Sequence, residues 1–183
     1  SIEPVLGCTG IGGPLNTNTF NSGSTSNRFG NRFSLPFPCR AFGAWVWMDG
    51  DGDFAIKLYD SAGTELVTTA AHVAAVRQAN AAELYHLPFT ATTNLTENTV
   101  YRLAVVPSSV TNLSTYNWDV PVAAMLDQFA GGQAVHETRF TSSVWTDTTT
   151  RRAFCGLYLD AFDDAVGGGA GGEGPLIGGR LTL

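Results

Sequence analysis

Alternating aspartates form the clearest set of candidate metal ligands in the sequence. These candidates are Asp49, Asp51 and Asp53. Their spacing resembles that of the carboxylate ligands in a calcium-binding loop. Two neighbours depart from that pattern: Phe54 stands where the loop needs glycine for its sharp turn, and Lys57 adds a positive charge beside the ion. We therefore interpret the segment as a hairpin turn, because Asp-Gly pairs tolerate positive φ, and keep calcium as the weaker alternative.

The other titratable residues follow no recognisable catalytic pattern. The three histidines are far apart in sequence and form no ligand pair of the His-x-His kind. The sequence contains no nucleophile elbow, phosphate loop or dinucleotide fingerprint. Asp160, Asp163 and Asp164 lead directly into a glycine-rich segment, so solvated charge at a strand end explains them better than paired catalytic carboxylates. We expect a protein that is not an enzyme and that uses no cofactor.

Aromatic residues are the remaining candidates for binding. Trp145 lies among Ser, Thr and Asp, which predicts a loop and a partly exposed indole ring. Such a ring can stack on a sugar or contact another subunit, and both interpretations stay open. Tyr116 and Trp118 are further candidates for a glycan or partner contact. Trp45 and Trp47 lie two residues apart on one strand face, where core packing is the better explanation.

Charge and composition exclude two classes of partner. The formal net charge is −6 and the ten Lys and Arg residues are scattered, so we expect no nucleic-acid binding. No apolar run approaches the roughly 20 residues of a membrane helix, so we expect no membrane insertion. Cys8, Cys39 and Cys155 make an odd count. We expect all three to be reduced, with a Cys39–Cys155 disulfide as the main alternative.

Short runs of alternating apolar residues, separated by turn-forming residues, predict an all-β protein. The expected strands are residues 40–48, 54–59, 65–70, 84–89, 99–106, 114–118, 133–141 and 153–161. A strand is also favoured within 71–82, and one short helix is expected from Asp119 to Leu126, where Asp and Pro suit a first turn. The expected fold is an antiparallel, jelly-roll-like β-sandwich of roughly eight to ten strands.

The chain divides into three parts by composition. Residues 1–32 have too few apolar residues for a regular element and predict an extended arm or connector. Residues 33–165 form the expected sandwich. Residues 166–183 form a glycine-rich tail, with eight glycines within 167–179. This tail ends in Leu181-Thr182-Leu183, so its end either docks on a neighbouring subunit or continues from a flexible hinge.

Several segments together resemble a family of bacteriophage and prophage structural proteins built from β-sandwich, jelly-roll-like modules. The segments are Asn21–Arg28, Arg32–Pro38, Gly43–Trp47, Trp145–Arg152, Gly156-Leu157 and Asp160–Asp164 before the glycine tail. The resemblance covers most of residues 15–170 and is to the last module with its tail. Such sequences carry other apolar residues at the positions of Cys39 and Cys155, which favours reduced, buried thiols. The family offers no catalytic residues to carry over.

The resemblance implies a virion component. We expect a non-enzymatic structural protein, either a head decoration, a fibre or a tail-associated subunit, that contacts other copies of itself or other virion proteins. Its place would be the particle surface, after assembly in the host cytoplasm. The alternative function is a carbohydrate-binding or receptor-binding module that attaches to a host-surface glycan.

Overall fold

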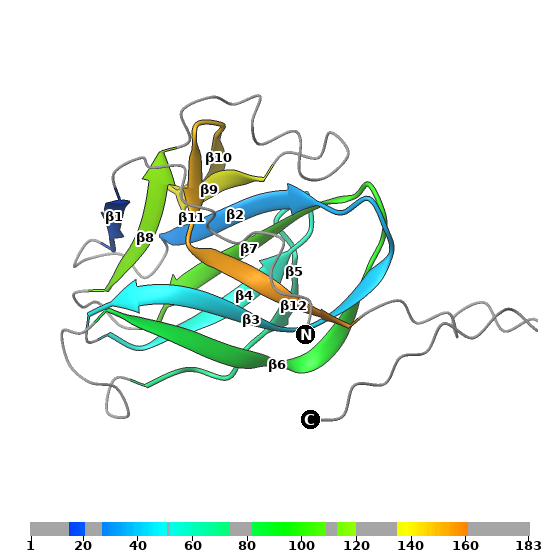
Figure 1. Cartoon of the computed structure of the whole chain (residues 1–183), viewed down its shortest axis with the longest axis horizontal. Coiled ribbons are helices and arrows are strands. Elements are labelled where there is room, and N and C mark those ends of the chain that lie inside the picture. The colour runs from blue at the N-terminus through cyan, green and yellow to red at the C-terminus, as the bar shows by residue number, and fades with distance from the viewer. Residues whose placement is uncertain are drawn as a thin grey trace, which may run out of the picture.

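The protein is a sandwich of two antiparallel sheets, each with six strands (Figure 1). The computed structural model describes residues 15–20, 27–50, 52–73, 82–108, 113–119 and 135–160. The first sheet, called the β3 sheet, contains β1 (Leu15–Thr19), β3 (Cys39–Asp49), β6 (Glu83–Leu95), β8 (Ser114–Asp119), β11 (Arg151–Ala153) and β12 (Cys155–Asp160). The second, called the β2 sheet, contains β2 (Arg28–Ser34), β4 (Phe54–Tyr59), β5 (Glu65–Thr68), β7 (Val100–Pro107), β9 (His136–Thr141) and β10 (Val144–Thr148). The predicted all-β sandwich is confirmed, with twelve strands in this described part of the chain instead of eight to ten.

Most connections carry the chain from one sheet to the other, as in jelly rolls. The turn after β3 is one of them, because β3 and β4 belong to different sheets. Gly50 does adopt a positive φ of 108°, as the Asp-Gly signal predicts. The predicted hairpin is nevertheless wrong, since an Asp-Gly turn sets the local bend but not the sheet to which the next strand belongs.

The core lies between the sheets and follows the alternation of the strands. On β4, Phe54, Ile56 and Leu58 are fully buried. On β3, Val46 and Met48 point into the same core. Burial of each large apolar side chain contributes roughly 1.5–3 kcal/mol. These two strands match their predicted ranges closely because their inward positions are uniformly apolar.

The interpretation of residues 1–32 as an arm without regular elements is wrong at two places. β1 pairs along its length with β8, and β2 lies between β7 and β9. Phe29, Asn31 and Phe33 alternate along β2 and are all buried. The polar Asn31 interrupts the apolar alternation, so the strand had no clear sequence signal.

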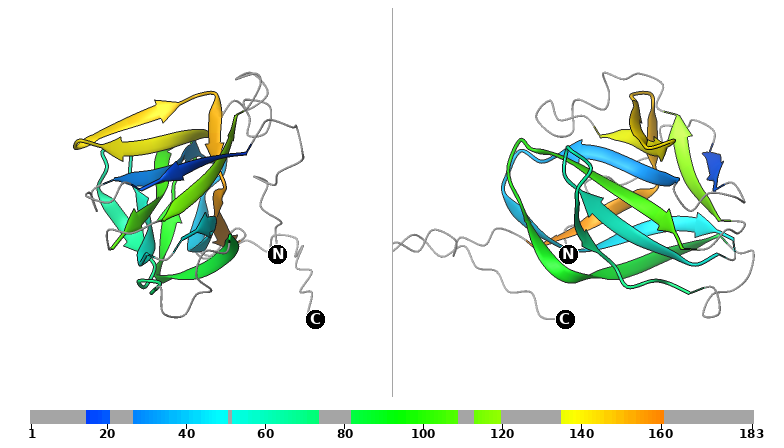
Figure 2. Two further views of the ribbon diagram at one scale, coloured as in Figure 1. Left: turned by 90° about the vertical axis from the view of Figure 1, so that its left-hand side faces the viewer. Right: turned by 180° about the vertical axis from the view of Figure 1, so that it is seen from behind.

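The interpretation of residues around Trp145 as a loop is also wrong. β9 and β10 form a hairpin, which Figure 2 shows in yellow at one end of the sandwich. Its turn residues, Ser142 and Ser143, have φ values of 51° and 66°. Two-residue hairpin turns with positive φ usually contain Asn or Gly, so the Ser-Ser sequence did not predict this hairpin.

Cys39 and Cys155 are free, buried thiols, as the reduced interpretation predicts. They lie on the neighbouring strands β3 and β12, but Cys155 pairs with Val46. That register places the two cysteines about seven residues, or about 23 Å, apart along the sheet, and a disulfide needs Cα atoms within about 7 Å. The Cys39–Cys155 alternative is therefore wrong.

We predict that both thiols resist modification in the folded protein. Burial raises the pKa of Cys39 to about 11 and that of Cys155 to about 12. In a Cys8→Ser variant, Ellman's reagent at about pH 8 should react at least 100-fold more slowly with native than with denatured protein, because the thiolate is the nucleophile. Since the folded state keeps these protons, the free energy of unfolding should also fall as the pH rises above about 9. Rapid labelling of native protein would contradict this prediction.

Three predicted features lie outside the described residues. These are the short helix beyond Asp119, the middle of segment 71–82, and the tail at 166–183. Asp119 itself ends β8. Among the described residues no helix is long and apolar enough to cross a membrane.

Candidate interaction surface on the β3 sheet

Strand β3 is apolar on both faces, and one of these faces points away from the core. Trp45 and Trp47 share this outer face, as predicted. Trp45 is 8% exposed because it packs over Gly156, where an added Cβ would lie 2.6 Å from the indole nitrogen. Trp47 is 41% exposed. Trp45 is therefore buried, but by packing over Gly156 on the outer face and not in the core between the sheets, and the prediction of core packing is wrong for Trp47.

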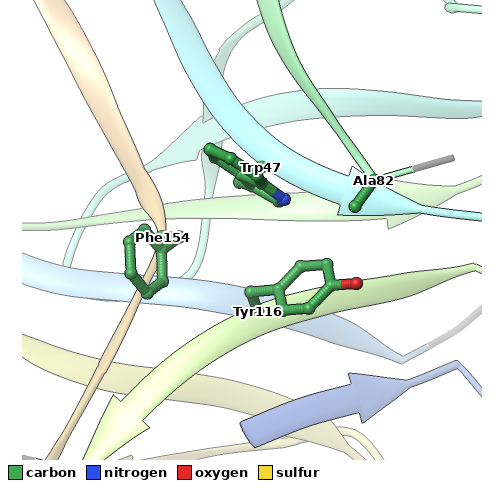
Figure 3. Close-up of a pocket in the computed structure, with 4 residues that line it drawn as sticks. All are labelled: Trp47, Ala82, Tyr116 and Phe154. Carbon is green, nitrogen blue, oxygen red and sulfur yellow. The ribbon is translucent and has the colours of Figure 1, made fainter. Parts of the chain in front are cut away.

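A pocket opens beside Trp47. Its walls are the rings of Trp47, Tyr116 and Phe154 and the methyl group of Ala82 (Figure 3). Its volume is about 170 Å³. The rings of Trp47 and Tyr116 meet edge to face, with 6.4 Å between their centroids and an interplanar angle of 79°. We call this site the Trp47 pocket.

The backbone of Phe154 explains why these three rings meet. Phe154 lies between β11, which pairs with β8, and β12, which pairs with β3. Its N–H donates to the carbonyl of Tyr116 at 2.8 Å, and its carbonyl accepts from the N–H of Trp47 at 2.9 Å. One residue thus connects two strands of the sheet and places its ring between theirs.

The exposed apolar surface continues along β3 away from the pocket. Leu84 pairs with Trp47 and is 44% exposed, and Phe42 is 43% exposed. Phe42 stacks on Tyr158 with 5.8 Å between ring centroids, and His86 stacks on Tyr158 at 5.7 Å. We call this set the outer apolar strip; it consists of Phe42, Trp47, Leu84, His86, Tyr116, Phe154 and Tyr158.

Polar groups border the strip at both ends. Beside the pocket, the hydroxyl of Tyr116 donates a long hydrogen bond of 3.5 Å to the carboxylate of Asp49. Burial of the ring raises the pKa of Tyr116, and the negative charge and hydrogen bond of Asp49 raise it further. At the other end, Arg40 forms an ion pair with Asp160. An acidic group therefore lies at the rim of the Trp47 pocket.

The structure brings together two of the three aromatic residues that the sequence singles out. Tyr116 lines the pocket, and Trp118 lies on the same strand face. Trp118 packs edge to face against Phe154, at 4.2 Å between centroids, and the guanidinium of Arg152 lies 5.9 Å from its ring. Trp47 and Phe154 were not predicted as binding residues; the two apolar faces of β3 were the available signal for Trp47.

Trp145 belongs to a different surface. It lies on β10 of the β2 sheet, is half-buried, and packs against Tyr59 and Phe140 at centroid distances of 5.3 and 5.1 Å. Gly63, with φ at 87°, makes room for it, since a Cβ there would lie 2.7 Å from the indole nitrogen. Trp145 therefore closes the outer side of Tyr59, and a ligand-binding role for it stays a prediction.

The acidic candidates do not gather into a metal site within the described residues. In that part of the chain no three His, Cys, Asp or Glu side chains lie close enough to hold an ion. Asp49 instead accepts the hydrogen bond from Tyr116. Asp51 lies outside the described residues, and the backbone carbonyl of Asp53 accepts from Ser108 N–H at 2.7 Å.

Comparison of the sequence with protein-family models and with the curated proteins finds no match.

Proposed function

We propose that this chain is a non-enzymatic structural subunit of a virion, located on the particle surface after assembly in the host cytoplasm. In this proposal it acts through contacts with other copies of itself or with other virion proteins. The main support for this proposal is the exposure of the outer apolar strip. Sandwich sheets that face water usually alternate polar residues on their outer side. A continuous exposed apolar patch is instead typical of an interaction surface.

The composition of the strip favours a protein partner. Interface cores are enriched in aromatic residues and depleted of charge, and the most important contacts are often Trp and Tyr side chains in desolvated pockets. Trp47, Tyr116 and Phe154 form such a pocket. The charged pair at the other end, Arg40 with Asp160, would lie at the polar rim of such an interface.

Oligomeric state tests the proposal. We expect the wild-type chain to exceed its monomer mass of 19.4 kDa in size-exclusion chromatography with light scattering, in a concentration-dependent way. Trp47→Ser should weaken association at least tenfold, because truncating an interface hot spot costs about 2 kcal/mol or more. Since Trp47 lies on the outer face of the sheet, 41% exposed and outside the core between the sheets, the fold should be preserved.

Val144→Ser provides the matched control. Val144 is 57% exposed, more than Trp47 or Leu84, but it lies on β10 of the other sheet. Its replacement should leave association unchanged. A wild-type chain that stays monomeric at all accessible concentrations, with and without other virion proteins, would contradict the proposed function.

Glycan binding is the second candidate, favoured by the position of Tyr116 and Trp118 on one exposed strand face beside the Asp49 carboxylate. Aromatic rings would stack on a sugar, and the hydroxyl–carboxylate pair would hydrogen-bond its hydroxyl groups. Because the rim is acidic, the ligand would be a neutral host-surface glycan. A glycan array that gives no signal with wild-type protein would remove this candidate.

A further inference from the structure

We infer that the Trp47 pocket binds the apolar segment Leu176–Leu183 of a second copy of this chain. The inference rests on the proposed function, because it names the partner and the contact through which the subunit would assemble. Four features of the chain support it: the walls of the pocket, the composition of the segment, the charge at the rim, and the direction of β12.

The pocket suits a single branched aliphatic side chain. Its walls are three aromatic rings and one methyl group, and this open pocket has a volume of about 170 Å³. An apolar cavity of about 150 Å³ accommodates benzene, which is comparable in size to the side chain of Leu or Ile. A hydroxyl or amide group that faced only the apolar walls, away from Tyr116 Oη and Asp49 at the rim, would lose its hydrogen bonds to water without a replacement. These walls therefore favour an aliphatic protein side chain over a sugar.

Segment 176–183 carries such side chains in a form that can approach a flat surface. Its sequence is Leu-Ile-Gly-Gly-Arg-Leu-Thr-Leu. The aliphatic residues come in two groups, Leu176-Ile177 and Leu181 with Leu183, and two glycines separate them. Because glycine has no Cβ, the backbone between the groups can lie close to the ring of Trp47 or Tyr116.

Charge at the rim matches the segment. Arg180 is its single charged side chain, and it directly precedes Leu181. Asp49 lies beside the pocket, where it accepts the hydrogen bond from Tyr116. With Leu181 in the pocket, Arg180 would reach the Asp49 carboxylate, and pairing of the two charges would fix the register of the segment.

The direction of β12 takes the chain away from its own pocket. The strand begins beside Phe154 at the pocket and ends at Asp160, which pairs with Arg40. Its six residues span about 20 Å. Residues 161–175 can span up to about 50 Å further, which is enough to reach a pocket on a neighbouring molecule. The proposed function requires a contact between subunits, and a segment that occupied its own pocket would remove that contact, so we assign the segment to a second copy.

Two full-length variants test the inference in combination. The pocket variant is Trp47→Ser, with the segment intact. The tail variant replaces Leu176, Ile177, Leu181 and Leu183 by serine, with the pocket intact. We expect each variant alone to associate at least tenfold more weakly than wild type. An equimolar mixture should form a one-to-one heterodimer, because the intact segment of one variant can occupy the intact pocket of the other.

The outcomes separate this inference from the proposed function. If the tail variant assembles as wild type does while the pocket variant does not, the inference is wrong and the proposed function stands. If the variants alone are weakened but their mixture does not associate, docking on a second copy is also wrong. A wild type that is monomeric on its own would contradict the inference, and one that stays monomeric with other virion proteins as well would also contradict the proposed function.

A synthetic peptide of residues 174–183 then tests pocket recognition separately. It should bind the tail variant, change its tryptophan fluorescence, and bind a chain that also carries Trp47→Ser at least tenfold more weakly. Equal binding to both chains would overturn the assignment of the pocket.

Discussion

Replacing Asn31 by leucine is expected to lower the free energy of unfolding by about 3–5 kcal/mol, measured by chemical denaturation. Asn31 is 2% exposed on the inner face of β2. Its Nδ2 donates to the carbonyls of Ala153 and Cys155 at 2.9 and 3.1 Å, and its Oδ1 accepts from the N–H of Ala153 at 2.8 Å. Leucine would leave these three backbone groups buried without that partner, and each unsatisfied group costs about 1–3 kcal/mol.

The position of these groups explains why the side chain matters. Between β11 and β12 the chain changes its pairing partner from β8 to β3, with Phe154 at the change. Asn31 reaches across from the other sheet and satisfies the backbone on both sides of Phe154. Because Phe154 is a wall of the Trp47 pocket, Asn31→Leu should also weaken assembly.

A second buried asparagine offers a matched control. Asn117 is fully buried on β8, and within the described part of the chain neither atom of its amide has a hydrogen-bond partner. Asn117→Leu removes a polar group that is already unsatisfied, so it should be close to neutral or stabilising. Equal destabilisation by the two replacements would show that the hydrogen bonds of Asn31 are not the source of the effect.

Regularity of the buried positions decided which strands the sequence could predict. β4 was predicted at its observed bounds because Phe54, Ile56 and Leu58 alternate with outward residues without interruption. β2 was not predicted because its central inward residue is the polar Asn31. This residue stabilises the fold through three hydrogen bonds to backbone groups more than 120 positions away in the sequence. Periodicity of apolar residues cannot detect such a residue.

The candidate site could not be predicted from one strand, because it is formed by residues from several segments of the chain. The apolar pattern of β3 on both faces predicted a central strand, and β3 does pair on both edges. The same pattern suggested that Trp47 would be covered. Whether an outer face is covered depends on the neighbouring elements. The neighbours of Trp47 are Tyr116 and Phe154, about 70 and 107 positions later in the sequence. Their rings extend the exposed surface instead of covering it. The sequence therefore predicted strand β3 but could not predict the Trp47 pocket.

Replacing Arg139 by methionine is expected to cost about 3–5 kcal/mol of unfolding free energy, because it leaves a buried carboxylate without its cation. Glu137 on β9 is fully buried. Its Oε1 accepts from Nε of Arg139 at 2.5 Å, and its Oε2 accepts from the Asn18 amide at 3.2 Å. Arg139 also donates to Oδ1 of Asn18 at 2.6 Å. The three side chains connect β1 to β9 across the sandwich, so the loss of Arg139 should loosen β1 as well.

The double variant Glu137→Leu/Arg139→Met separates the value of the pair from the penalty of breaking it. Removing both charges takes away the desolvation cost of each, so the double variant should recover most of the stability that Arg139→Met loses. Lys57→Met is the control for a surface pair: Lys57 on β4 and Glu65 on β5 lie 2.7 Å apart with both side chains partly exposed, so this change should cost about 1 kcal/mol or less. If Arg139→Met were as mild as this surface control, the Glu137 carboxylate would have to be hydrated by water entering the sandwich, and it would then not act as a buried link between β1 and β9.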